Sequence, residues 1–110
     1  MALFITYASY SQAGLKALLK RPEDRTEAIN ALLKAAGGRV VAMYNTTGAN
    51  DVVLVSEAPD GTDAVALAMA VTASGVVAKA ETVRAWTGDD FVEVIQKAAA
   101  LTGSYTPPGG

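Results

Sequence analysis

The chain contains neither cysteine nor histidine. Without cysteine it can form no disulfide, thiolate nucleophile, iron–sulfur cluster or cysteine-ligated zinc site. Without histidine it lacks the side chain that most often serves as a general base, a metal ligand or the proximal ligand of haem. Any catalysis would therefore use carboxylates, lysine, tyrosine, serine or threonine, and we expect no metal site and no cofactor.

Charged residues are also scarce, at 18% of the 110 positions, and the nine basic and eleven acidic side chains leave a net charge of −2. The basic residues are scattered, so we expect no binding to nucleic acid or to an anionic membrane. Hydrophobic residues make up 51% of the chain, which is the balance of an ordered globular protein. We expect a single domain over residues 1–103 and a flexible tail over residues 104–110.

Long hydrophobic runs are missing too. The uncharged stretch from Ala64 to Ala78 is shorter than the ~20 apolar residues of a membrane-spanning helix, and Gly75 interrupts it. The first residues, MALFITYASYSQ, carry no basic region and become polar at Ser9, which is not typical of a signal peptide. These features predict a soluble, cytoplasmic protein.

The apolar periodicity predicts strands and helices that alternate along the chain. Period-two or β-branched runs indicate four strands, and apolar residues at helical spacing indicate four helices. The strands are expected at residues 2–8, 39–47, 51–58 and 76–87, and the helices at residues 11–20, 22–36, 62–73 and from 87 to about 103. In the last helix, Phe91, Val94, Ile95 and Ala98 share one stripe.

This order, βαββαβ with an extra C-terminal helix, is typical of the ferredoxin-like α+β fold. In that fold a four-stranded antiparallel sheet carries its helices on one face, and the other face is bare in a monomer. Apolar residues occur on both faces of the second and third predicted strands. We therefore expect two sheets to meet face to face in a homodimer or higher oligomer.

The segment TTGANDVVLVSEAP joins those two strands. Gly48, Ala49 and Asn50 separate the apolar runs, and glycine and asparagine tolerate the positive φ angles of hairpin turns. Asp51 has two interpretations, a carboxylate beside a ligand or a structural side chain that accepts hydrogen bonds from turn amides. We favour a structural role for Gly48, Asn50 and Asp51, because aspartate and asparagine are preferred in turns for that local reason.

Three segments resemble the GYD-domain family: YNTTGANDVVLVSEAPD, ETVRAWTGDDF and AGGRVVAMY. The resemblance covers about residues 3–95. Gly48 and Asp51 match the first and last positions of the family's Gly-x-Tyr-Asp turn, and Asn50 stands where the family has tyrosine. The resemblance implies a small bacterial protein of the dimeric α+β barrel group and implies oligomerisation. It implies no reaction, because the family is largely uncharacterised.

Four side chains are candidates for binding a ligand. Arg84 and Trp86 share one face of the last predicted strand, where a guanidinium could grip a carboxylate beside an indole wall. The alternative is an interface pair, since tryptophan and arginine are enriched at interfaces. Tyr7 and Tyr44 could line a pocket between sheet and helices, or each could be a core residue whose hydroxyl reaches a backbone carbonyl.

Two functions from different classes remain open. The first is a module that binds a small apolar or aromatic molecule between the sheet and the helices or at a subunit boundary. The second is a cofactor-independent enzyme, of the oxygenase or isomerase type, acting on an activated aromatic substrate. The second rests on analogy with other proteins of the dimeric α+β barrel group.

Overall fold

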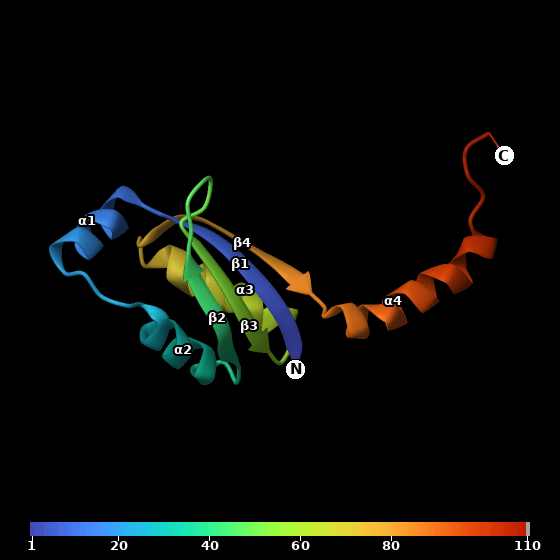
Figure 1. Cartoon of the computed structure of the whole chain (residues 1–110), viewed down its shortest axis with the longest axis horizontal. Coiled ribbons are helices and arrows are strands. Elements are labelled where there is room, and N and C mark those ends of the chain that lie inside the picture. Colours follow the sequence, from blue (N-terminus) through green and yellow to red (C-terminus); the bar gives the residue numbers. More distant parts are fainter. Residues whose placement is uncertain (110) are drawn as a thin grey trace.

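A four-stranded antiparallel sheet forms the centre of the computed structural model, which describes residues 1–109 (Figure 1). Gly110, the last residue of the predicted tail, lies outside the described residues. The strands are β1 (Ala2–Tyr10), β2 (Arg39–Asn45), β3 (Val52–Ala58) and β4 (Val77–Ala85), in the order β2-β3-β1-β4. All neighbouring strands are antiparallel. The predicted ferredoxin-like α+β fold is thus confirmed.

The helices are α1 (Gln12–Lys20), α2 (Thr26–Ala35), α3 (Gly61–Ala73) and α4 (Gly88–Leu101), followed by a 3₁₀ turn at Thr102–Ser104. Three of them begin at a side-chain cap, because a polar oxygen accepts hydrogen bonds from free amides of the first turn. The caps are Ser11 for α1, Asp60 for α3 and Thr87 for α4. The Thr87 cap, which bonds the amide of Asp90 at 3.1 Å, agrees with the predicted start of the last helix.

Helix α2 begins later than the sequence predicts. The pattern places Pro22 in its first turn, but the helix starts at Thr26, whose amide donates to Asp24 Oδ1 at 2.9 Å. Hydrogen bonds from the side chain and the backbone of Thr26 hold the pKa of Asp24 below its ordinary value of 3.8. This local turn competes with the helix and leaves residues 22–25 outside it.

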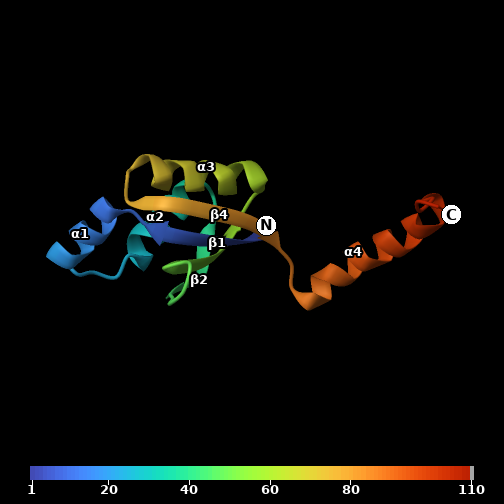
Figure 2. The same cartoon turned by 90° about the horizontal axis from the view of Figure 1, so that it is seen from above.

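Helices α2 and α3 cover one face of the sheet, and the core lies between these layers (Figure 2). One cluster joins Leu33 of α2, Leu54 of β3 and Leu67 of α3. Two further clusters continue the core beneath α3 and toward the end of β1; they contain Phe4, Ala58 and Ala64, and Ala8, Val52 and Val77. The hydroxyls of Thr6 and Thr82 lie in this layer and bond each other at 2.9 Å.

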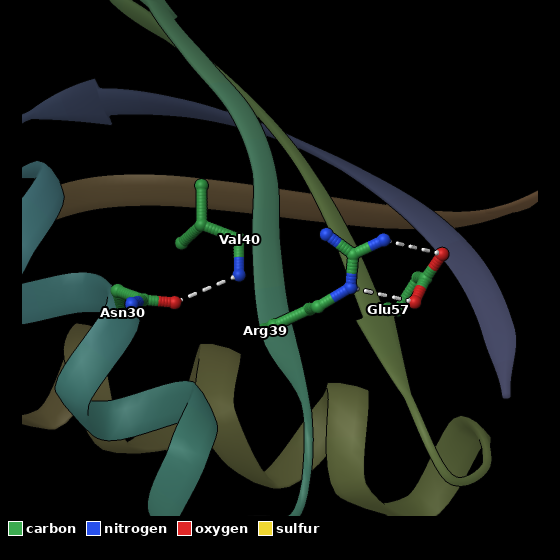
Figure 3. A network of polar contacts seen from close by, with 4 residues as sticks. All are labelled: Asn30, Arg39, Val40 and Glu57. Atoms are coloured by element: carbon green, nitrogen blue, oxygen red, sulfur yellow. Dashed lines mark hydrogen bonds and ion pairs between the residues drawn. The ribbon is translucent and has the colours of Figure 1, made fainter.

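The edge strand β2 is tied both to α2 and to its neighbour β3 (Figure 3). The amide of Val40 donates to Asn30 Oδ1 at 3.0 Å, beside an irregularity in the pairing of β2 with β3. Arg39 and Glu57 face each other across the two strands and form two hydrogen bonds, of 3.0 and 3.2 Å. These contacts fix the edge that borders α2.

The opposite face of the sheet, here called the open face, carries the alternate side chains of each strand. Its residues are half-buried or exposed rather than buried, and none of the helices in residues 1–109 packs a buried core against it. Two rows cross it in register: Tyr7, Val53 and Tyr44, and Val83, Ile5, Val55 and Ala42.

Helices α1 and α4 stand at opposite ends of the molecule, outside the two layers (Figures 1 and 2). The chain measures 60 × 32 × 22 Å along its principal axes, and α4 accounts for much of the long dimension. Within the described chain, no helix is both long enough and apolar enough to cross a membrane.

Candidate functional site

A cavity lies between the sheet and helices α2 and α3, with a volume of about 280 Å³. Its floor includes Ala8 of β1 and Leu54 of β3, and its walls include Ile29 of α2 and Val71 of α3. The lining is mostly apolar. Ligand pockets in proteins run from about 300 to 1,000 Å³, so this cavity is near the lower end and suits a small molecule.

A few polar groups accompany these apolar walls. The hydroxyl-bearing residues Thr6, Tyr10 and Ser74 and the cation Arg25 are among the lining residues. The Tyr10 hydroxyl receives a long hydrogen bond of 3.4 Å from Asn45 Nδ2, and Arg25 Nη1 donates to Glu23 Oε1 at 2.9 Å. These groups could orient a ligand that carries one polar substituent on an apolar body.

Tyr7 and Tyr44 do not line this cavity. Both lie on the open face, on either side of Val53 in one cross-strand row. Tyr44 is 64% exposed. The sequence suggested a tyrosine pair between sheet and helices; the structure keeps the two residues in one row but places them on the other side of the sheet, because a residue's parity along its strand decides its face.

Arg84 lies on the helix-covered side at the far end of β4, opposite the buried Phe4, and Trp86 follows just after the strand ends. The Arg84 guanidinium stacks between two rings, 5.7 Å from the centroid of Phe4 and 4.3 Å from that of Trp86. Its Nη1 donates to the backbone oxygens of Leu3 and Ala85. Trp86 meets Phe91 of α4 edge to face, with centroids 5.6 Å apart. These contacts join the strand end to the start of α4.

A shallow cleft borders this aromatic cluster. Its lining includes Arg84 and Trp86 together with three carboxylate residues, Asp89, Asp90 and Glu93. Three carboxylates repel an anionic ligand, and Arg84 Nη1 already donates to two backbone oxygens. The four predicted ligand residues are therefore divided between two faces of the sheet, and no single cavity unites them.

The segment between β2 and β3 is hydrogen-bonded to β1. The connection spans residues 46–51, longer than the predicted three residues, and Gly48 adopts a φ of 95°. Asp51 links it to β1 twice: its amide donates to Ala8 O at 2.8 Å, and its Oδ2 accepts from the amide of Tyr10 at 2.9 Å. Asn50 contributes its backbone oxygen, which accepts from Thr46 Oγ1 at 2.7 Å.

Sequence reasoning did not identify the cavity residues as a site. Ile29, Leu67 and Val71 have the spacing of ordinary core positions, and nothing local separates a cavity wall from a packed core. The sequence does contain one indication: Ala8 and Ala80 lie on the neighbouring strands β1 and β4, and Ala68 lies on α3, which packs over them. Small residues on facing elements leave space that larger side chains would have filled.

Within residues 1–109, no group of three or more histidine, cysteine, aspartate or glutamate side chains is placed so that it could hold a metal ion.

Comparisons with known proteins support the fold and assign no reaction. The family model described as "GYD domain" matches residues 4–95. Among solved structures, the chain is similar to the crystal structure of TTHA0845 from Thermus thermophilus, with 17% sequence identity and a TM-score of 0.50. That alignment covers 80% of this chain and 96% of the other. No curated protein matches. Because the family model spans most of the sequence, from β1 into α4, the chain belongs to the GYD-domain family.

Proposed function

We propose that this protein binds a small apolar or aromatic molecule in the cavity between the sheet and helices α2 and α3. The observation that carries the proposal is the cavity of about 280 Å³ with apolar walls and few polar groups, among them Tyr10, Arg25 and Ser74. Apolar walls with a small number of polar groups are typical of small-molecule sites. The volume favours a ligand of one or two rings.

Catalysis in this cavity has less support. Among the described residues that line it, none is a carboxylate or a lysine. A reaction that needs a general base would have only the hydroxyls of Thr6, Tyr10 and Ser74, since the Arg25 guanidinium remains protonated. The same lining is sufficient to bind and orient a ligand, so binding is the function that we propose.

Filling the cavity should abolish binding. Ala68 of α3 lines the cavity, and in Ala68→Leu the larger side chain would occupy the space of the ligand. With indole and 1-naphthol as probes, we expect the unmodified protein to show a rise in Tm, since a ligand at 100 times its Kd stabilises the folded state by about 2.7 kcal/mol. Thermal shift followed by calorimetric titration would measure this, and Ala68→Leu should show neither signal.

The matched control is Ala66→Leu, two residues away on α3. Ala66 is exposed and does not line the cavity, so this variant should bind the probes as the unmodified protein does. Equal binding by both variants would place the ligand elsewhere and refute the site. No binding of either probe by the unmodified protein would remove the support for an aromatic ligand.

We also propose that the open face is the contact with a second copy of the chain. Its centre is apolar, with Ile5, Val53, Val55 and Val83 on three adjacent strands. A contiguous apolar sheet face is stabilised when another apolar surface covers it. The same surface on a second chain is complementary in chemistry, and a two-fold pair uses it on both sides.

A charged side chain on the open face would become buried on association and should therefore weaken self-association. In Ile5→Lys an ammonium would be enclosed without a partner, and we expect the dissociation constant of the oligomer to rise at least about tenfold. Light scattering over a concentration series would measure the mass. Met69→Lys, at a position on α3 that is 67% exposed, is the control and should associate normally. Equal association of the two variants would contradict this interface.

A further inference from the structure

Helix α4 presents an apolar stripe that its own chain does not bury. None of its fourteen described residues is buried. Phe91 is 40% exposed, Ile95 55% and Leu101 66%. An amphipathic helix normally buries such a stripe, and a lone helix of about 12–15 residues is marginal in water. A covering surface outside these residues would therefore stabilise α4.

The first turn of α4 contacts the end of β4, and the rest of the helix projects away from the two layers. The Thr87 hydroxyl accepts from the amide of Asp90 at 3.1 Å. Phe91 packs edge to face on Trp86, and the Arg84 guanidinium lies over the Trp86 ring. Figure 1 shows the helix extending beyond the end of the sheet. With its first turn fixed in this way, α4 directs its apolar stripe beyond its own chain.

Helix α1, at the other end of the molecule, also leaves most of its apolar surface exposed. Gly14 is its only buried residue, lying against the backbone of Val76, and Leu15 and Leu19 are 50% and 73% exposed. These leucines lie four residues apart and share one face of the helix. The α1 surface and the α4 stripe are thus both apolar and both unpaired within residues 1–109.

The two helices carry opposite net charges. Helix α4 has Asp89, Asp90 and Glu93 in its first two turns and Lys97 further on, which pairs with Glu93 at 3.5 Å. Helix α1 has no acidic residue; it carries Lys16 and Lys20, and Arg21 follows at its C-cap. Opposite charges around an apolar contact steer association and select its partner.

One chain cannot bring its own α1 and α4 together in this arrangement, because they lie at opposite ends of a molecule 60 Å long (Figures 1 and 2). We propose that α4 of one protomer packs its apolar stripe on α1 of a second copy, and that the opposite net charges of the two helices favour this pairing. In a two-fold pair the contact forms twice and leaves neither helix free. The proposal deepens the proposed self-association, but it involves surfaces separate from the open face.

Disulfide trapping tests this contact directly, because the chain has no cysteine of its own. A Leu19→Cys chain is mixed with an Ile95→Cys chain and oxidised with copper phenanthroline. We expect a covalent heterodimer at twice the chain mass, several-fold above its yield with Met69→Cys in place of Leu19→Cys. Met69 is a matched control on α3, since it is 67% exposed compared with 73% for Leu19. Equal yields with the two partners would overturn the proposal.

The same cysteine substitutions distinguish a contact between α4 and α1 of two protomers from a contact within one chain. In a doubly substituted Leu19→Cys/Ile95→Cys chain, contact between protomers gives covalent dimers, whereas contact within a chain gives an oxidised monomer and would refute the proposal. Repeating the heterodimer experiment with Ile5→Lys in both chains separates the two interfaces. A heterodimer that still exceeds the Met69→Cys control then supports the α1–α4 contact even if the open face is not an interface.

Charge reversal provides a second, independent readout. In the Ile95→Cys chain, the combined changes Asp89→Lys, Asp90→Lys and Glu93→Lys should lower the heterodimer yield several-fold. In the Leu19→Cys chain, the combined changes Lys16→Glu, Lys20→Glu and Arg21→Glu should restore that yield. Restoration cannot come from an unwound α4, so it separates a lost contact from a lost helix. Unchanged yields after reversal of α4, or no restoration, would contradict the charge pairing.

Discussion

Replacement of Gly38 by alanine is expected to lower the free energy of unfolding by about 3 kcal/mol, at the upper end of what overpacking usually costs. Gly38 is buried where α2 turns into β2, and its amide donates to Leu33 O at 2.8 Å. A Cβ atom there would overlap the carbonyl oxygen of Glu57 and lie 3.2 Å from the Cα of Ala58. Both are backbone atoms of β3, so relief requires β2 and β3 to move apart.

Gly61→Ala is the matched control for this change. A Cβ at Gly61, the first residue of α3, would meet no atom within 4 Å. Alanine also favours helix over glycine, so this variant should be as stable as the unmodified protein or slightly more stable. Urea unfolding followed by circular dichroism would compare the two. Similar stabilities of Gly38→Ala and Gly61→Ala would show that the strand contact is not tight in solution.

Leu33→Ala should destabilise the protein by about 2–5 kcal/mol, the range measured for large-to-small changes in cores. The Leu33 side chain is 2% exposed and joins α2 to Leu54 of the sheet and Leu67 of α3. Leu54 and Leu67 also line the cavity between the sheet and the helices, so the space vacated would lie next to space that is already empty. The neighbours then have few atoms with which to fill it, and the loss of packing persists.

An exposed apolar side chain of similar size provides the comparison. Met69→Ala, at 67% exposure, should change stability by less than about 0.5 kcal/mol. Equilibrium unfolding in urea measures both variants under the same conditions. If Leu33→Ala were no more destabilising than Met69→Ala, α2 would not be docked on the sheet as the structure places it, and the cavity would lose one wall.

The predicted site residues show which features a local sequence pattern can predict and which it cannot. Arg84 and Trp86 were predicted to share one face of the last strand, but β4 ends at Ala85, so strand parity assigns a face to Arg84 and not to Trp86. Parity alone does not reveal that Tyr7 and Tyr44 lie on the open face. Which face of β1 meets the helices depends on packing between segments that are distant in the sequence. The cavity was missed for the same reason: three alanines border one space only after three elements have been assembled.

The sequence by itself determined the elements of this protein and, through their order, its fold, and three of its segments indicated the family. Periodicity, caps and glycines act over a few residues, so they can be recognised without a structure. Only the tertiary structure decided which sheet face stays open, where the cavity lies and that α1 and α4 stand at opposite ends. Those features depend on contacts between residues far apart in the chain, and no local pattern encodes the angle at which a helix leaves a sheet.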